Sequence, residues 1–257
     1  MHKELRKYIV SLLDKGKRSD GRALDQYRQP VSVTYGVSET AEGSAQVQIG
    51  DTIVMAGVKL SIEKPFPDTP EQGGIAVNVE LYPLSSPDFE PGPPGIYAVE
   101  LARVVDRGIR ESKAIDMKKL CIEKGEKAWT VGIDIVTIND AGNLFDACSL
   151  AAMAALKNTV FPKYEDGELN YKEKTKKKLQ LYKEPTSVTI YKIGKSYIVD
   201  PNMDESHVYD ARLTVASTAD GMLSALQKGG EMPLTSHDIN VMIDLAIQKA
   251  NFLREKL

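Results

Sequence analysis

Alternation of apolar and polar residues predicts β-strands in the first half of the chain. In residues 44–60, SAQVQIGDTIVMAGVKL, Val47 and Ile49 alternate with polar residues, Gly50-Asp51 follows, and a β-branched run comes next. This pattern is typical of a hairpin with a two-residue turn. Residues 73–84 and 128–140 alternate in the same way, so each is predicted to form a strand.

Apolar residues at helical spacing predict four longer helices. Residues 3–15 place four aliphatic side chains on one face, and residues 96–114 follow a loop of four prolines and two glycines. A third helix is predicted after a glycine turn and runs to Asn158. The fourth follows Thr235, which lies three residues before Asp238, the spacing of a capping box.

The order of these elements predicts an α+β protein with two related lobes. Hairpins and long helices occur in the first half and again, in shorter form, in the second. We expect an N-terminal helix and basic turn (1–29), a first domain (30–165), a polar lysine-rich linker (166–184) and a smaller second domain (185–257).

Composition is that of an ordinary soluble domain and excludes few functions. The 257 residues are 42% hydrophobic and 27% charged, with a net charge of −3, which argues against a surface that coats nucleic acid but allows one local basic groove. The charged, amphipathic N-terminus is neither a signal peptide nor a membrane anchor, so we expect a cytoplasmic protein with no membrane partner. Cys121 and Cys148 have apolar neighbours and are expected to be reduced packing residues.

One acidic cluster is a candidate site. The segment VDPNMDESHVYD contains Asp200, Asp204 and Glu205, which could hold a divalent ion or supply a general acid, or could form a solvated turn after Asp200-Pro201. Three histidines, His2, His207 and His237, lack metal-ligand spacing. We therefore predict no metal site from the sequence.

Basic residues supply the candidate nucleic-acid contacts. Arg103, Arg107 and Arg110 project from one face of the helix predicted at 96–114 and could bind successive phosphates. Glu100, Asp106 and Glu111 lie three or four residues away and could instead form ion pairs with these arginines. The lysines of residues 172–183 are most simply a solvated segment.

The stretch NDAGNLFDACSLAAMAAL, residues 139–156, reads as a strand end, a glycine turn and a helix N-terminus. Such turns present backbone N–H groups that bind phosphate readily. Here Gly142 is followed by Asn143 and Leu144, with no hydroxyl or cation beside it.

Five motifs in order resemble the RNase PH family, from about residue 17 to the C-terminus. They are KRSDGR, EGSAQVQIGDTIVMAGVKL, ELARVVDRGIRESKA, TVGIDIVTINDAGNLFDACSLAAMAAL and IVDPNMDE. The resemblance implies a ribosomal-protein-S5-like fold with a shorter second lobe of similar topology. It also implies hexameric rings that degrade RNA from the 3′ end with inorganic phosphate as the nucleophile.

Departures from the family pattern predict a chain without catalysis of its own. Catalytic members carry Ser or Thr followed by Arg where this chain has Asn143 and Leu144, and an arginine pair where it has Ile96 and Tyr97. Asp200 matches the first of two family aspartates, but the second position holds a serine. The degenerate phosphate site (Gly142, Asn143, Leu144) and residual acidic cluster resemble the non-catalytic subunits of the archaeal exosome.

That resemblance implies partners. They are a catalytic RNase PH-type subunit, in a ring of three heterodimers, S1-domain RNA-binding cap proteins, and the 3′ end of single-stranded RNA. Arg103, Arg107 and Arg110 are expected at the RNA backbone, with Lys59 and Lys64 as secondary candidates. Phosphate, and a divalent metal ion if one is used, would bind in the partner subunit rather than here.

Two alternatives remain open from the sequence. The chain could be an active phosphate-dependent 3′–5′ exoribonuclease that uses Asp200 with Asp204 or Glu205 as its acidic pair. It could also be an S5-like interaction module recruited elsewhere.

Overall fold

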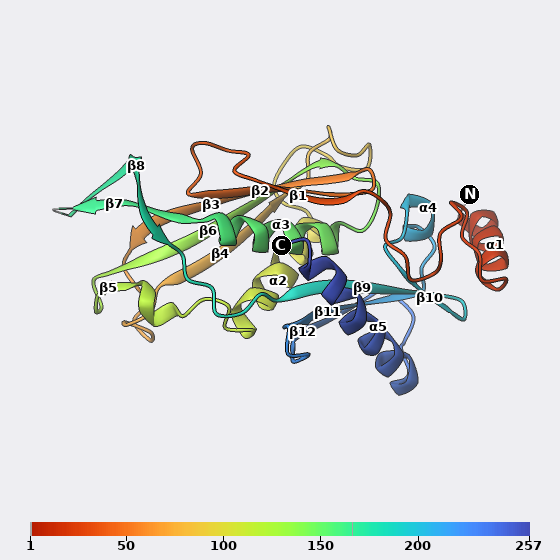
Figure 1. Cartoon of the computed structure of the whole chain (residues 1–257). Coiled ribbons are helices and arrows are strands. Elements are labelled where there is room, and N and C mark those ends of the chain that lie inside the picture. Colours follow the sequence, from red (N-terminus) through yellow and green to blue (C-terminus); the bar gives the residue numbers. More distant parts are fainter. Residues whose placement is uncertain (1, 166) are drawn as a thin grey trace.

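The computed structural model describes residues 2–165 and 167–257, with only the backbone described for His2 and Lys174. The chain begins with helix α1 (His2–Leu13), which lies at one end of the molecule (Figure 1). A basic turn and an extended segment then lead into the first lobe.

The first lobe is built on a mixed six-stranded sheet. Its strands are β1 (Val31–Tyr35), β2 (Gly43–Ile49), β3 (Thr52–Glu63), β4 (Gly74–Glu80), β5 (Cys121–Glu123) and β6 (Lys127–Asn139). The order is β1-β2-β3-β6-β4, and β5 pairs with β6. Only the pairing of β4 with β6 is parallel, because helix α2 (Ile96–Glu111) and the short 3-10 helix η1 (Met117–Leu120) connect these strands.

The second lobe repeats the design on a smaller scale. Strands β9 (Thr186–Ile193), β10 (Ser196–Val199), β11 (Ala211–Ser217) and β12 (Leu223–Gly229) form an antiparallel sheet in the order β10-β9-β11-β12. The one-turn helix α4 (Met203–Ser206) follows β10, and α5 (Ser236–Arg254) packs on β9 and β11. Thr235 and Asp238 form the predicted capping box at the start of α5.

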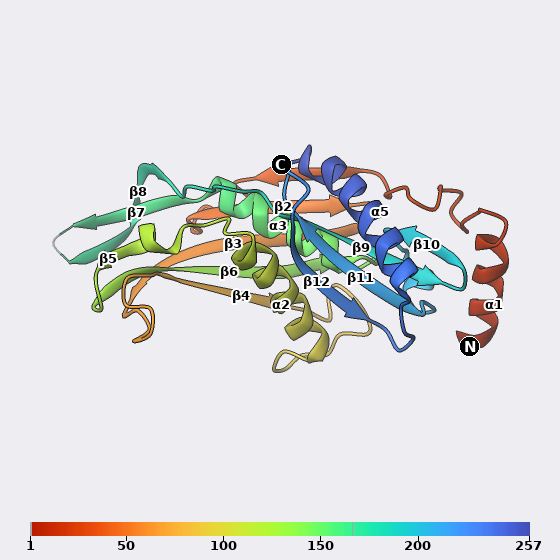
Figure 2. The same ribbon diagram turned by 90° about the horizontal axis from the view of Figure 1, so that it is seen from below.

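Helix α3 (Leu144–Asn158) is the centre of the fold. Every residue from Leu144 to Leu156 is buried, because α3 packs on β2 and β3 of the large sheet and on β9 of the small sheet. Helix α2 lies beside α3 and also contacts β4 and β12 (Figure 2). The layers are therefore large sheet, α2 and α3, small sheet, and α5, and the predicted α+β fold class is confirmed.

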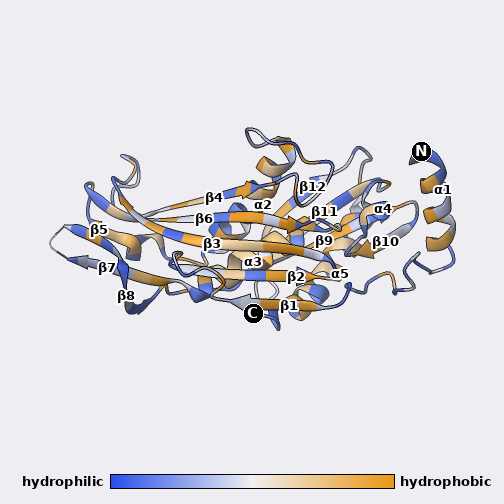
Figure 3. Ribbon diagram, turned by 90° about the horizontal axis from the view of Figure 1, so that it is seen from above, coloured by the Kyte–Doolittle hydropathy of each residue, from blue (hydrophilic) through white to orange (hydrophobic). Residues whose placement is uncertain are grey.

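Side-chain hydropathy follows these layers. In Figure 3 the central strands β3 and β6 are largely hydrophobic in colour, as expected for strands that cover the buried helices. Val54, Val58, Leu60, Ile133 and Ile135 are all fully buried.

The segment predicted as a polar linker (166–184) contains a strand that the sequence did not predict. Residues Glu168–Lys178 form strand β8, which pairs with β7 (Val160–Glu165) in a separate two-stranded sheet. Lysine and glutamate have low strand propensity, so the sequence of this segment resembles a linker. Pairing with β7, whose Phe161 and Pro162 are buried, compensates for that low propensity. No helix in the described part of the chain is long and apolar enough to cross a membrane.

Candidate functional site

The turn between β6 and α3 has the backbone shape predicted from the sequence, but the N–H and carbonyl of its glycine already have partners. Gly142 has a φ of +107°, and a Cβ there would lie 2.5 Å from the carbonyl oxygen of Pro201, so only glycine fits. The Gly142 N–H donates to Asp140 Oδ1 at 2.9 Å, and Thr52 Oγ1 donates to the Gly142 carbonyl at 2.7 Å. A backbone donor that could serve an anion is thus bound to a carboxylate.

Asn143 caps α3 in the left-handed region and turns its side chain inward. Its φ is +60°, it makes no side-chain capping bond, and only 3% of its surface is exposed. Nδ2 donates to Asp146 Oδ2 and to Asp200 Oδ1, both at 3.0 Å. The structure therefore brings two predicted features together, the degenerate phosphate turn and the acidic cluster, through an amide that bridges two buried carboxylates.

Leu144 points into the hydrophobic core and is fully buried. The Leu144 side chain therefore faces the core and does not line the cavity beside the turn. The neighbouring Asp146 is also fully buried and accepts hydrogen bonds from Tyr27 Oη (2.7 Å) and the Thr189 N–H (2.7 Å). Burial raises the pKa of Asp146 to about 7, although its hydrogen-bond donors act in the opposite direction.

Asp200 is held by arginines rather than exposed to a ligand. It is fully buried and accepts bonds from Arg28 Nη2 (2.8 Å), Arg28 Nε (3.0 Å) and Arg22 Nη1 (3.1 Å). The Arg28 backbone N–H adds another bond at 2.6 Å, beside the one from Asn143 Nδ2. With its oxygens satisfied in this way, Asp200 positions the N-terminal segment against the second lobe.

Glu205 has a similar partner. Arg18, 3% exposed, donates from both Nε (2.9 Å) and Nη2 to the Glu205 carboxylate. Arg18 also donates to the carbonyls of Val199 (2.8 Å) and Asp200 (2.9 Å). Asp204, by contrast, is exposed. The three acids are adjacent in sequence but do not converge, and the described residues contain no group of three or more His, Cys, Asp or Glu side chains placed to hold a metal ion.

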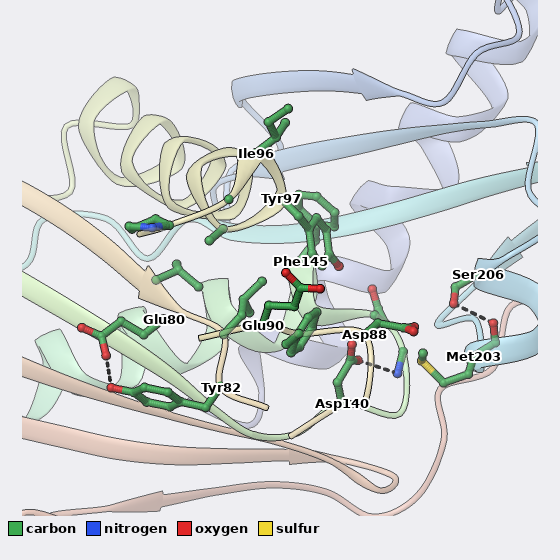
Figure 4. A pocket seen from close by; sticks show the side chains of 18 of the residues that line it. Glu80, Tyr82, Asp88, Glu90, Ile96, Tyr97, Asp140, Phe145, Met203 and Ser206 are labelled. Carbon is green, nitrogen blue, oxygen red and sulfur yellow. Dashed lines mark hydrogen bonds between the residues drawn. The ribbon is translucent and has the colours of Figure 1, made fainter. Parts of the chain in front are cut away.

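A cavity of about 930 Å³ opens beside the α3 turn, between the loop of residues 85–95 and the second lobe (Figure 4). Four carboxylates line it: Glu80, Asp88, Glu90 and Asp140. Arg212 also lines it, but its Nη2 lies 2.7 Å from Glu100 Oε2, so its charge is already balanced. Burial raises the pKa of Asp140, although the Gly142 N–H and the charge of Arg28 act in the opposite direction.

Aromatic rings occupy the start of α2, the place where the resemblance stated above implies an arginine pair in catalytic members. Tyr97 packs 5.8 Å from Phe145 and 6.4 Å from Phe89, measured between ring centroids. Ile96 is 92% exposed at the first position of the helix (Figure 4). Together with the acidic lining, these residues make the cavity unfavourable for inorganic phosphate, because four carboxylates line it and Arg212, the arginine among its described lining residues, is paired with Glu100.

The predicted arginines lie on the exposed face of α2, and their surroundings differ. Arg110 pairs with Asp106 at 2.7 Å and donates to the Ile75 carbonyl at 3.1 Å. Within the described part of the chain, Arg107 donates only to the neutral Gln227 Oε1, at 3.2 Å. Among the described residues Arg103 makes no side-chain hydrogen bond or ion pair, because Glu100 pairs with Arg212 instead. Arg103 and Arg107 thus keep their charge available for an anion.

The two secondary lysines have acidic partners. Lys59 Nζ lies 2.9 Å from Glu42 Oε1, a buried carboxylate, and 4.7 Å from the Tyr171 ring centroid. Lys64 lies 3.2 Å from Glu126, and both side chains are exposed. Lys59 is therefore engaged in stabilising Glu42, and Lys64 keeps a weakly held charge.

Sequence reasoning missed the arginine partners of the acidic cluster and the acidic wall of the cavity. Arg18, Arg22 and Arg28 lie more than 170 residues before their carboxylates. The only available signal was the basic turn KRSDGR, which supplies two of these arginines and has no local acid to balance both. Asp88 and Glu90 stand in the proline-rich loop, but nothing in the sequence says that this loop covers α3.

Comparison with protein families covers both lobes. The model of the 3′ exoribonuclease family, domain 1, known as RNase PH, matches residues 27–162, and that of domain 2 matches residues 183–249. The chain belongs to the RNase PH family. Within it, the exosome complex component Rrp42 of Methanocella arvoryzae is 51% identical, over 98% of this chain and 95% of the relative. Rrp42 of Thermococcus gammatolerans is 47% identical, over 98% and 93%.

Solved structures agree with this RNase PH assignment. A chain of the Archaeoglobus fulgidus exosome with RNA bound to the active site superposes with a TM-score of 0.92 at 46% identity, covering 99% of this chain and 98% of that one. A chain of an archaeal exosome core gives a TM-score of 0.87 at 43% identity, covering 99% and 96%. Rice Rrp46, at 18% identity and a TM-score of 0.69, shares the fold.

Proposed function

We propose that this chain is a non-catalytic, RNA-binding subunit of an archaeal exosome ring. A second RNase PH-type subunit would carry out 3′-to-5′ phosphorolysis, and the two would alternate as three heterodimers. Relatives that are 44–51% identical over nearly the full chain bear the name of an exosome component, which supports membership of such an assembly.

The observation that carries the non-catalytic role is the state of the α3 turn. Leu144 is in the core, the Asn143 amide binds two carboxylates, and the Gly142 N–H is bound to Asp140. Phosphate would enter a cavity with four acidic side chains and no unpaired arginine among its lining residues. Loss of preorganised donors of this kind costs about 10²–10³ in rate for each one removed.

The positive role rests on α2. Arg103 and Arg107 are exposed and lack acidic partners in the described structure, so they can bind the phosphate backbone without reading bases. In the ring, α2 would present them to RNA whose 3′ end lies in the partner's active site. Phosphate, and a divalent ion if the reaction uses one, would bind there, while S1-domain cap proteins would deliver RNA. This assembly would act in the cytoplasm.

The test is phosphorolysis with and without the partner. The isolated chain, given single-stranded RNA and inorganic phosphate, should release no nucleoside diphosphates, and mixing it with the catalytic subunit should give processive release. Omitting phosphate is the control, because contaminating hydrolytic nucleases do not need it. Phosphate-dependent release by the isolated chain would overturn the proposal and favour an enzyme active in its own right.

A further inference from the structure

The strand β8 carries the densest positive charge in the sequence. Residues 168–178 include five lysines and two glutamates, in a chain whose net charge is −3. One of the glutamates, Glu173, pairs with Lys163 at 3.2 Å on the neighbouring strand. That glutamate is therefore engaged by Lys163 on β7.

These lysines face solvent. Lys172, Lys176, Lys177 and Lys178 are all exposed, and among the described residues none of the four forms an ion pair. Lys177 instead lies 4.9 Å from the Phe161 ring centroid. The β7–β8 hairpin projects beyond the large sheet, at the end of the molecule away from α1 (Figures 1 and 2).

Lysines on an edge strand also protect a sheet against pairing with other chains. In β8 irregular pairing already provides such protection. Val160 pairs with Lys178 and Pro162 with Lys174, so between these pairs β8 advances by four positions while β7 advances by two. This β-bulge interrupts the regular edge of the strand. Protection against pairing with other chains therefore does not account for a row of lysines without acidic partners.

We propose that the β7–β8 hairpin is a second RNA-binding surface, in which the β8 lysines contact phosphates of RNA outside the active-site channel. Flexible lysines bind phosphates as point charges without reading sequence, which suits a substrate of any sequence. Exposed Tyr171 lies on the same strand and provides a ring on which a base can stack. The inference rests on the proposed function, because that function brings RNA to this surface.

The experiment uses the reconstituted ring with K172Q/K176Q/K178Q, which removes three charges from exposed positions. Binding of a long single-stranded RNA and of a ten-nucleotide RNA is measured without phosphate across a salt series. We expect affinity for the long RNA to fall about tenfold or more at low salt, and its salt slope to fall by about 2, since each lost single-strand contact removes about 0.7. Binding and phosphorolysis of the short RNA should not change.

The matched control is K3Q/K15Q/K17Q, which removes the same charge at the α1 end of the molecule. This variant should bind both RNAs with unchanged affinity and salt slope. Equal losses in the two triple variants, or an unchanged salt slope for the hairpin variant, would overturn the inference. Failure of the hairpin variant to enter the ring would show a subunit interface instead, which also overturns it. If the unmodified ring released no nucleoside diphosphates, the proposed function would fail separately.

Discussion

Asp146 is a carboxyl group enclosed by the core at the start of α3. Its neighbours Tyr27, Asn143 and Thr189 donate to it, yet burial dominates and raises its pKa from 3.8 to about 7. The folded protein therefore holds a proton that the unfolded chain releases between these two values. The stabilising contribution is complete below about pH 4 and is lost as the pH rises through 7.

We predict that the free energy of unfolding of the wild type falls as the pH rises from 4 to 7. In D146N this fall should be absent. For one group the decline is on the order of 4 kcal/mol, at about 1.4 kcal/mol per pKa unit. An Asn side chain has one hydrogen-bond acceptor fewer than an Asp side chain. D146N should therefore also be less stable than the wild type at pH 5, where Asp146 keeps its proton. Urea unfolding of both proteins from pH 4.5 to 8 measures this, and parallel curves would contradict the prediction.

At the scale of elements, the N-terminal segment contacts α4 through a buried ion pair, and Arg22 Nη2 lies 4.0 Å from the same carboxylate. Arg18 and Glu205 have side chains that are 0% and 1% exposed, with the capping box of α4 built on the same glutamate. Removing one partner leaves the other charge buried without compensation, so E205A should lower the free energy of unfolding by about 3–5 kcal/mol.

Glu126 offers the matched comparison for that prediction. Its pair with Lys64 is exposed, so E126A should cost about 1 kcal/mol or less. The double variant R18M/E205L should recover much of the E205A loss, because it removes both charges. Chemical unfolding of the wild type, E205A, E126A and R18M/E205L measures these differences. Similar losses of unfolding free energy in E205A and E126A would show that the buried pair contributes no more than the exposed one.

The α2 arginines should differ in their effect on RNA. In the reconstituted ring, R103A and R107A should each weaken binding about 5–10-fold and lower the salt slope by about 0.7. R110A should change both less, because Asp106 already neutralises that arginine. Measuring RNA affinity against salt for the three variants tests this order. A larger effect of R110A would mean that its ion pair opens when RNA binds.

Elements with strong local patterns were predictable, and those that depend on distant partners were not. The β2–β3 hairpin, β6 and α3 appear where alternation and the apolar run place them. β8 was missed because its residues favour solvent, and it forms a strand only by pairing with β7. The residues of the candidate site also fall into a predictable and an unpredictable group. Asn143, Leu144 and Asp200 could be found from the sequence, whereas Arg18, Arg22 and Arg28 could not, since their partners come from the other lobe.

Across the whole molecule, the proposed loss of a phosphate site would involve several elements from both lobes. The α3 turn, the aromatic entrance of α2, the loop of residues 85–95 and the arginine-bound Asp200 all contribute. Changing one of them back therefore cannot rebuild the site. The residues at 143 and 144 provide the sharpest test, because they are the positions where catalytic relatives hold phosphate.

We predict that N143S/L144R does not release nucleoside diphosphates in isolation and is less stable by at least about 3 kcal/mol. Leu144 is fully buried, and a guanidinium in its place would lie in the apolar core or force the turn to move. L144M, with a similar volume, should cost less than about 1.5 kcal/mol and support the ring normally. Thermal unfolding and the phosphorolysis assay measure both outcomes. A folded double variant with phosphate-dependent activity of its own would show that the acidic cavity tolerates phosphate, and that the α3 turn alone keeps this chain inactive.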